Sequence, residues 1–330
     1  MKKSIFTLLL IIVIITVLMF VESNKKTEVP GGPTEKTTIN IGSLKGPTSI
    51  GMLKIMEDNK TGKASNTYNF TVTGTPDEIT AKLVKGEIDI AAIPCNLASV
   101  LYKNTNGGVV VLSTNTLSVL NILEVGNEIK SIYDLKGKTI YTTGKGTVPE
   151  YTLMYLLEVA GIKDEVTVEF KSEPAEVATL LQQGTAKVAM LPQPYATTVL
   201  KQNTDVRIAL DIGEEWNNLQ EDNVEIITGV TVVRKEFLED HKEAVIRFLE
   251  EYKTSTEYVN ANIEKAATLS DEFDIIPLAV AKEAIPLCNI TFAEGQTMKD
   301  MVSGYLQILF DKNPSSVGGT LPDENFYFKR

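Results

Sequence analysis

The sequence predicts an α/β fold of two lobes, each a doubly wound sheet, with a cleft between them and a hinge of two chain crossings. The first observation is a duplication: residues 83–103 (LVKGEIDIAAIPCNLASVLYK) and 181–201 (LQQGTAKVAMLPQPYATTVLK) share one plan, 98 residues apart. In each copy a helix closes on Gly, a short apolar run typical of a buried strand follows, and a Pro-containing turn starts a second helix. Elements that alternate in this way imply parallel strands with helices on both faces of the sheet.

The duplication extends upstream, which is the second observation. Lys45 and Gly46 recur as Lys145 and Gly146, and each pair follows an apolar run typical of a strand. In open α/β sheets the ligand binds outside the carboxyl ends of the strands. We therefore expect four loops to meet at one cleft: residues 45–49, 94–96, 145–150 and 192–195.

The third observation is the order of the elements after the second copy. Residues 225–233 (EIITGVTVV) form a β-rich run that would return the chain to the first lobe, and apolar residues at helical spacing follow it. This order predicts a discontinuous first lobe. The expected boundaries are residues 39–115 and 228–330 for lobe I and 116–227 for lobe II, with crossings near residues 114–117 and 226–229.

The predicted ligand-binding residues come from the four loops and the first crossing. Pro47 and Pro149 stand near helix starts, where a Pro leaves the next backbone N–H groups free to face the cleft as a site for an anion or a carbonyl group. Short polar side chains in these loops serve equally well as helix N-caps, so capping alone remains an alternative for each of them. The predicted set is Lys45, Gly46, Pro47, Thr48, Ser49, Pro94, Cys95, Asn96, Thr116, Gly146, Thr147, Pro149, Gln193, Pro194 and Tyr195.

The side chains of this set favour a neutral or weakly anionic heterocycle as the ligand. Asn96 and Gln193 carry amides that both donate and accept hydrogen bonds, and Tyr195 can cover the face of a planar ring. No arginine occurs in the four loops, which argues against a bidentate clamp on a carboxylate or a sulfonate. Of the other aromatic candidates, Tyr151 is expected to pack in the core, and Trp216 to pack in the core or lie beside the hinge.

Length, composition and charge indicate a two-domain globular protein and argue against a nucleic-acid-binding protein. At 330 residues, with 43% hydrophobic and 23% charged residues, the chain is long enough for two domains with their own cores. The net charge is −11 and only four arginines occur. Because phosphate binding needs a basic face, this composition argues against a nucleic-acid partner.

The sequence holds no recognisable catalytic or metal-binding constellation. His241 is the only histidine, and it lies in an acidic helical stretch with no nucleophile beside it. Cys95 and Cys288 are far apart in the sequence and are expected to be free thiols, and no metal-ligand spacing occurs. We therefore expect no enzyme activity, no metal and no cofactor.

The N-terminus is typical of an export segment. Two lysines precede an apolar run at residues 5–21, after which polar residues return. Residues 1–23 are therefore predicted to be a signal peptide or a membrane anchor, and residues 24–38 a flexible tether. Bacterial lipoproteins look similar here but need a Cys just after the apolar run, and this chain has none. That departure leaves cleavage after Ser23, retention as an anchor, or a Cys that has been replaced.

Three stretches resemble a known family. Residues 86–94 (GEIDIAAIP), 134–147 (DLKGKTIYTTGKGT) and 192–200 (PQPYATTVL) are similar to type II periplasmic solute-binding proteins of ABC importers. Within that fold the chain is most similar to the group for nitrate, sulfonate, taurine and thiamine-pyrimidine precursors. The similarity runs from about residue 39 to residue 310. Where that group often has Glu-Pro-aromatic, this chain has Gln-Pro-Tyr at residues 193–195.

The resemblance implies an exported, extracytoplasmic protein that captures a small molecule between two lobes and delivers it to an ABC permease. Its partners would be the small molecule, the permease and, through the N-terminal segment, the membrane, and we expect a monomer. Two other functions remain open. One is an enzyme on the same fold that acts on a pyrimidine-like precursor, and the other is a ligand-sensing extracytoplasmic domain.

Overall fold

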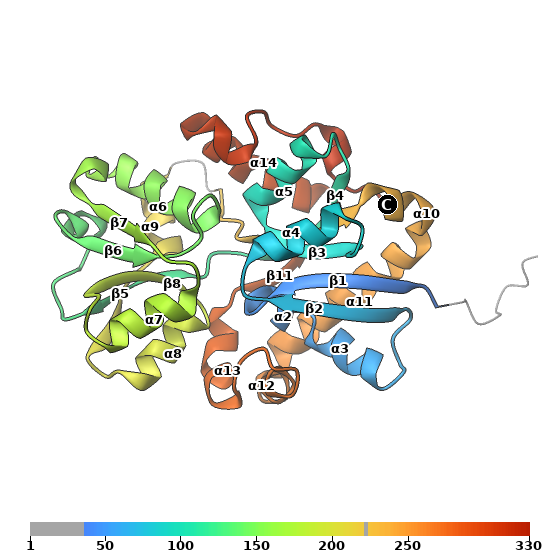
Figure 1. The fold of residues 1–330 in the computed structure, drawn as a ribbon, viewed down its shortest axis with the longest axis horizontal. Helices are drawn as coiled ribbons and strands as arrows, with labels where there is room; N and C mark the ends of the chain where they lie inside the picture. Colours follow the sequence, from blue (N-terminus) through green and yellow to red (C-terminus); the bar gives the residue numbers. More distant parts are fainter. Residues whose placement is uncertain (1–35, 221–223) are drawn as a thin grey trace, which may run out of the picture. The chain divides into compact units, whose positions relative to one another are not determined.

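The computed structural model describes residues 36–220 and 224–330, which form two β-sheets with helices packed around them (Figure 1). Thr37–Arg330 forms one compact unit. The predicted export segment, residues 1–23, and nearly all of the predicted tether lie outside the described residues. Within the described ranges, no helix is long and apolar enough to cross a membrane.

The first sheet has six strands in the order β11-β4-β10-β3-β1-β2. Its strands are β1 (Thr38–Leu44), β2 (Thr67–Thr73), β3 (Ile90–Pro94), β4 (Val109–Thr116), β10 (Gly229–Arg234) and β11 (Ile290–Ala293). The helices in the same parts of the chain are α2 (Pro47–Ile50), α3 (Leu53–Lys60), α4 (Pro76–Val84), α5 (Cys95–Asn104), α10 (Lys235–Asp240), α11 (Lys242–Ala261), α12 (Ile263–Glu272), α13 (Leu278–Ala284) and α14 (Gly295–Lys312). Short 3-10 segments are η3 (Ile285–Leu287), η4 (Pro314–Val317) and η5 (Glu324–Phe326).

The second sheet has five strands in the order β7-β6-β8-β5-β9. Its strands are β5 (Leu120–Val125), β6 (Thr139–Thr142), β7 (Thr167–Phe170), β8 (Val188–Pro192) and β9 (Val206–Asp211). The helices and 3-10 segments between them are η1 (Ile132–Leu135), α6 (Val148–Val159), η2 (Lys163–Glu165), α7 (Pro174–Gln182), α8 (Tyr195–Gln202) and α9 (Ile212–Leu219).

The duplication predicted from the sequence appears again in the strand pairing. β1 pairs in parallel with β3 and sets Ile41 opposite Ile90, while β6 pairs in parallel with β8 and sets Ile140 opposite Val188. β2 and β7 extend the two sheets on the other side, also in parallel. The predicted α/β fold on two sheets is therefore confirmed.

The sheets are mixed, whereas the alternation of elements predicted parallel strands alone. β10 runs antiparallel to β3, and β5 runs antiparallel to β8. The crossings explain this difference. β4 ends at the carboxyl edge of the first sheet, so the chain enters the second sheet from its carboxyl edge and β5 runs in the opposite direction to its neighbour. The return crossing delivers β10 to the first sheet in the same way.

The two crossings run beside each other. β4 ends at Thr116 and β5 begins at Leu120 in the other sheet, and the return crossing ends where β10 begins at Gly229. The Thr228 N–H donates a hydrogen bond to Thr116 O over 3.0 Å. The strands thus divide between two sheets at these crossings, and the further division into two lobes that move as domains stays a prediction.

The helices that follow β10 pack mainly around the first sheet. α11 contacts α3 and β11, and α14 contacts β4 and α5, although α14 also contacts α6. Trp216 of α9 is fully buried, with its ring centroid 4.6 Å from that of Tyr155 and 5.8 Å from that of Tyr305 on α14. Trp216 is therefore a core residue that joins α14 to the helices around the second sheet.

Candidate ligand-binding cleft

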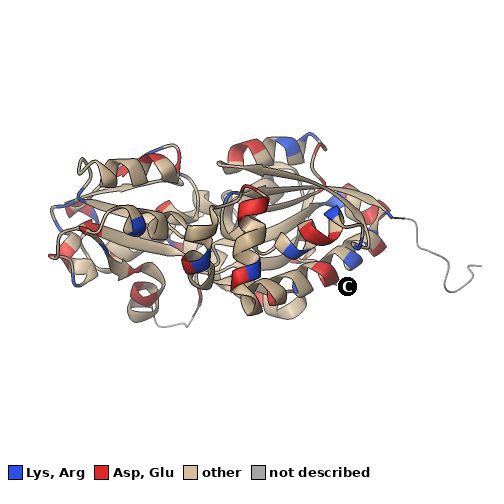
Figure 2. Ribbon diagram, turned by 90° about the horizontal axis from the view of Figure 1, so that it is seen from below, with Lys and Arg blue, Asp and Glu red and all other residues tan. Residues whose placement is uncertain are grey.

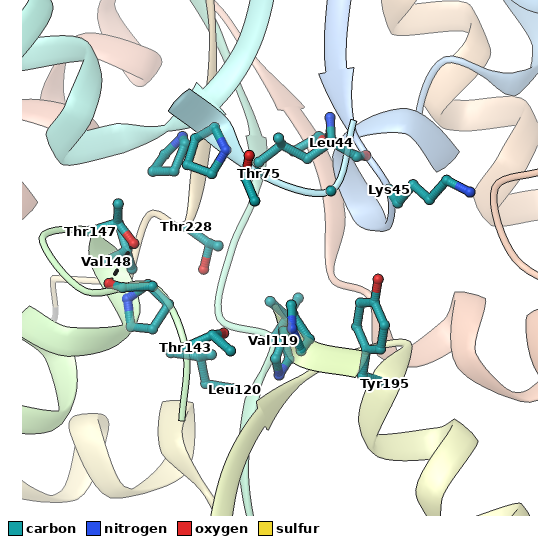
Figure 3. Close-up of a pocket in the computed structure, with 18 of the residues that line it drawn as sticks. Leu44, Lys45, Thr75, Val119, Leu120, Thr143, Thr147, Val148, Tyr195 and Thr228 are labelled. Carbon is teal, nitrogen blue, oxygen red and sulfur yellow. Dashed lines mark hydrogen bonds between the residues drawn. The ribbon is translucent and has the colours of Figure 1, made fainter. Parts of the chain in front are cut away.

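A cavity of about 320 Å³ lies where strands of both sheets end (Figure 3). β1, β3 and β4 of the first sheet reach it with Leu44, Pro94 and Thr116. β8 of the second sheet reaches it with Pro192, and Leu120 at the start of β5 completes this side. The cavity is therefore outside the carboxyl ends of the strands, where ligands of open α/β sheets bind.

Many of the residues predicted from the sequence line this cavity. They are Lys45, Pro47, Thr48, Pro94, Thr116, Thr147, Pro149, Gln193 and Tyr195. The other predicted residues are absent from the lining as the structure describes it: Gly46, Ser49, Cys95, Asn96, Gly146 and Pro194. All four predicted loops thus contribute to one cavity, and contact of their residues with a ligand stays a prediction.

Ser49 and Cys95 are turned into the protein interior. The Ser49 hydroxyl lies 2.6 Å from Ser43 Oγ and donates to Leu44 O over 2.7 Å, so it completes the end of β1. Cys95 is fully buried, and burial raises the pKa of its thiol. Cys288 is likewise buried and unpaired, and burial raises the pKa of its thiol to about 12. Both thiols are therefore protonated at neutral pH and lack the thiolate needed for reactivity.

Gly46 and Pro194 face each other from opposite loops at the edge of the cavity. Gly46 has a φ of 131°, a value that residues with a side chain rarely adopt. A Cβ at this position would lie 3.5 Å from Pro194 Cδ. The peptide bond between Gln193 and Pro194 is cis. The loop after β1 therefore approaches the turn after β8 at a position that has no side chain of its own.

Asn96 joins three segments of the chain beside the cavity. Its side chain is fully buried, and its Nδ2 donates to Gly146 O over 3.1 Å and to Ser316 O over 3.0 Å. Its Oδ1 has no hydrogen-bond partner among the described residues. From the start of α5, Asn96 therefore holds two other segments, the loop before α6 and the 3-10 segment η4. These bonds explain why its side chain does not face the cavity.

Two of the threonine hydroxyls at the cavity are held by the backbone. Thr48 Oγ1 donates to Leu44 O over 3.1 Å, and Thr147 Oγ1 donates to Gly144 O over 2.7 Å, the bond drawn in Figure 3. Thr147 is the N-cap of α6 but makes no side-chain capping bond, so the capping alternative does not describe it. Thr228 differs, because its Oγ1 is enclosed and has no hydrogen-bond partner within the described part of the chain. Figure 3 shows this hydroxyl directed into the space between the loops.

Gln193 and Tyr195 form one wall of the cavity. Gln193 Oε1 accepts from the Thr197 N–H over 3.2 Å and from the Thr197 hydroxyl over 2.7 Å. The half-buried Tyr195 ring stands beside the cavity at the start of α8 (Figure 3). Burial, together with the carboxylate of Glu173, raises the pKa of Tyr195 further above neutral pH.

Comparison with known proteins identifies the family. A family model described as "ABC transporter, phosphonate, periplasmic substrate-binding protein" matches residues 61–279. The chain belongs to this family. It is therefore an extracytoplasmic substrate-binding protein of an ABC transporter by descent, with a ligand and a permease as partners. No curated protein matches the chain in sequence.

Solved structures of binding proteins share the fold at low sequence identity. An ABC transporter structure from Parabacteroides distasonis is 22% identical, with a TM-score of 0.74 over 89% of this chain and 100% of its own. The periplasmic aliphatic sulphonate binding protein SsuA from Escherichia coli is 17% identical, with a TM-score of 0.70 over 89% and 93% of the two chains. The periplasmic nitrate-binding protein NrtA from Synechocystis PCC 6803 is 12% identical, with a TM-score of 0.63 over 86% and 84%. These similarities support the two-sheet fold of the family.

The cavity of this family member is lined by lysines but, among the described residues, by no arginine. Lys45 Nζ lies 3.3 Å from the exposed Asp274 carboxylate, and Figure 3 shows its side chain extending away from the cavity. Lys145 Nζ lies 6.0 Å from the centroid of the Phe170 ring. Lys171 is the third lining lysine. The lining therefore carries positive charge on a chain whose net charge is −11.

Two of the four arginines lie on strands and pair with buried carboxylates. Arg207 pairs with Glu124 over 2.6 Å, and Arg234 pairs with Asp89 over 2.8 Å. Both carboxylates are buried, so each guanidinium pairs with a charge that has little contact with water. Elsewhere, basic side chains are interspersed with acidic ones on the helices around both sheets (Figure 2).

The sequence analysis missed the loops that follow β2 and β7. Both line the cavity, with Gly74, Thr75, Pro76 and Asp77 on one side and Lys171, Ser172 and Pro174 on the other. A signal for them was present, since Pro76 and Pro174 occupy matched positions in the duplication and each follows a strand. Strand ends, the two crossings and the loop before α6 supply the rest of the missed lining: Leu44, Val119, Leu120, Thr143, Gly144 and Thr228. Lys145, Val148 and Pro192 lie within two of the predicted loops, although they were not in the predicted set of ligand-binding residues.

No three His, Cys, Asp or Glu residues in the described ranges are grouped so that they could hold a metal ion. The polar side chains that line the cavity carry hydroxyls, ammonium groups, the amide of Gln193 and the carboxylate of Asp77, which bind a molecule by hydrogen bonds and charge. This inventory matches the family, whose description and structural relatives are those of binding proteins in transport.

Proposed function

We propose that this protein captures a small molecule in the cavity between two lobes and delivers it to the permease of an ABC importer. The cavity carries the proposal, because it is lined by matched loops from both copies of the duplication. The lobes are the two parts on either side of the crossings, residues 39–115 with 228–330 and residues 116–227. Binding draws them together, and the closed form is the one that the permease receives.

The favoured ligand is a planar molecule that is neutral or weakly anionic. Tyr195 offers an aromatic face, and Val119, Leu120 and Val148 offer apolar contacts. No arginine among the described lining residues is available to clamp a carboxylate in bidentate geometry. A second candidate is a small oxyanion, which is favoured by the lysines at the cavity and by the phosphonate, sulphonate and nitrate named for the family and its structural relatives.

The decisive experiment is mass spectrometry of the small molecules released when freshly purified full-length protein is denatured. We expect one compound in near-stoichiometric amount. When it is returned to refolded protein, calorimetry should show binding, and ligand binding to the folded state should raise the melting temperature by mass action. X-ray scattering should show a smaller radius of gyration in the bound state. An unchanged radius at saturation would exclude closure of the lobes.

The same compound separates a binding protein from an enzyme on this fold. We expect it to be recovered chemically intact after prolonged incubation, because the proposal includes no reaction. Conversion to a new mass would favour the enzyme alternative.

We also propose that residues 1–23 direct export and that the protein acts as a monomer. Cell fractionation and light scattering test these two points.

A further inference from the structure

Gln193 is almost completely enclosed and yet lines the cavity. Only 2% of its surface is exposed, and it stands at the junction between β8 and α8. Two hydrogen bonds to Thr197, of 3.2 Å from the backbone N–H and 2.7 Å from the hydroxyl, hold one branch of its amide against the first turn of α8. The side chain is therefore fixed in position before any ligand arrives.

These bonds also determine which end of the amide faces the cavity. A backbone N–H can only donate, so the branch against the Thr197 N–H must be the carbonyl oxygen. The amino group Nε2 is then the branch that points away from Thr197. Among the described residues, no acceptor binds it. The Gln193 side chain thus leaves two hydrogen-bond donors free for the cavity that it lines, while its carbonyl oxygen Oε1 is engaged.

Other polar groups nearby can also donate, although a hydroxyl accepts hydrogen bonds as well. The Tyr195 hydroxyl carries a proton that it can donate, and burial and the Glu173 carboxylate raise its pKa further above neutral pH. The Thr228 hydroxyl, enclosed and without a partner in the described chain, has a proton to give. The lining lysines add positive charge, and Asp77 is the one carboxylate among the described lining residues.

We propose that Gln193 is a specificity-determining residue that admits molecules with a hydrogen-bond acceptor and rejects molecules that offer only a donor at this point. Thr197 is its positioning residue, because it fixes the amide with Nε2 toward the cavity. The acceptor is a ring nitrogen or oxide of a heterocycle or an oxyanion oxygen, two sources of the same chemistry. This inference rests on the proposed function, since it concerns the same cavity.

The test is a calorimetric titration of the full-length protein with two matched pairs of probes. Pyridine N-oxide and aniline are planar, neutral rings that offer an acceptor and N–H donors respectively. Methylphosphonate and methylammonium are small ions of opposite sign that offer the same contrast. We expect wild-type protein to bind at least one acceptor probe and neither donor probe. Which acceptor probe binds distinguishes the heterocycle from the oxyanion.

Variants then test whether Gln193 causes the preference for acceptor probes. Gln193→Glu replaces Nε2 with an oxygen, so an acceptor probe faces an acceptor and its affinity should fall about five- to a hundredfold. Thr197→Val keeps the shape but removes one of the two bonds that orient the amide, and should weaken the same probe several-fold. Thr197→Ser, which retains the hydroxyl, should restore wild-type affinity. Gln202→Glu makes the same chemical change at an exposed position at the end of α8 and serves as the control.

The outcomes separate this inference from the proposed function. If wild-type protein binds a donor probe as tightly as its acceptor partner, or if Gln193→Glu binds the acceptor probe like Gln202→Glu, the selection by Gln193 is refuted while a binding cavity remains. A compound that is released from purified protein and has no acceptor group refutes it too. If no probe binds and denatured protein releases no small molecule, the proposed function itself fails.

Discussion

The turn after β3 and the turn after β8 occupy matched positions in the duplication, but they lie in different surroundings. In the second copy, Gln193 and Tyr195 line the cavity. In the first copy, Cys95 and Asn96 are both fully buried, and Asn96 holds backbone carbonyls of two other segments. One backbone plan thus supports a wall of the cavity in one copy and an internal tie in the other.

The difference arises from the neighbouring strand. Pro94 lies opposite Gly229 of β10, whereas Pro192 lies opposite Leu120 of β5. A Cβ on Gly229 would come within 2.3 Å of Asn115 Oδ1, so the glycine makes room for a buried polar side chain. Leu120 instead puts an apolar side chain against the cavity. Strand pairing preserved the backbone after duplication, while the residues around each turn set its role.

The largest effect should come from filling the space beside the first turn. Gly229→Ala forces Asn115 to move away from its bonds to Thr231 and Thr116, and overpacking of this kind should lower the free energy of unfolding by about 3 kcal/mol. Denaturant unfolding without ligand measures it. The control is Gly304→Ala in α14, where a Cβ meets Val224 at an ordinary 3.4 Å. That variant should be neutral or more stable. Equal stability of the two variants would contradict the packing argument.

The next effect tests whether Asn96 is a tie or a ligand contact. Asn96→Ala removes two buried hydrogen bonds and should lower the free energy of unfolding by about 2 kcal/mol without ligand. Gln193→Ala should change this free energy less and should weaken ligand binding more. Asn104→Ala, at the exposed end of the same helix α5, is the control for Asn96→Ala. If Asn96→Ala leaves stability intact and weakens binding, the two turns have the same role.

The contrast between the turns also shows what could be read from the sequence. The fold followed from the duplication and from the rule that ligands bind at carboxyl ends of strands, and these depend on local patterns. The role of Asn96 depends on Ser316, which lies 220 residues away in the chain. No local pattern reports such a contact. The orientation of Gln193 was accessible in principle, because Thr197 follows it by one helical turn.

A third effect concerns the two buried ion pairs, one in each sheet. Burial alone would raise the pKa of Glu124. Its carboxylate accepts hydrogen bonds from the Glu128 and Ile129 N–H groups and from Arg207, and together these interactions lower the pKa below its ordinary value. A lowered pKa stabilises the fold above the ordinary carboxyl pKa of about 4.5, and this contribution is lost as the pH falls further.

Glu124→Gln should therefore lower the free energy of unfolding by about 1–2 kcal/mol at pH 7. The deficit relative to wild type should shrink below about pH 4.5, because the wild-type carboxylate then gains its proton as well. Urea unfolding at a series of pH values measures this convergence. Glu128→Gln, whose side chain is 78% exposed, should follow wild type throughout. A deficit that stays constant down to pH 3 would rule out the charge of Glu124 as its source.

The smallest effect compares the matched far ends of the two helices that the turns begin. Lys201, at the end of α8, pairs with Glu283 of α13, whereas its counterpart Lys103 on α5 makes no ion pair within the described residues. The Lys201 and Glu283 side chains are 33% and 59% exposed, so water and salt screen the pair. Lys201→Ala should therefore lower the free energy of unfolding by about 0.5 kcal/mol or less, and Lys103→Ala should have no effect. A double-mutant cycle with Glu283→Gln at low and high salt isolates the pair.

The same variants test ligand binding, since α8 begins at the cavity wall. Both lysines lie at the far ends of their helices, so both variants should bind ligand like wild type. Weaker binding in Lys201→Ala alone would mean that the contact between α8 and α13 holds the second turn in its binding position.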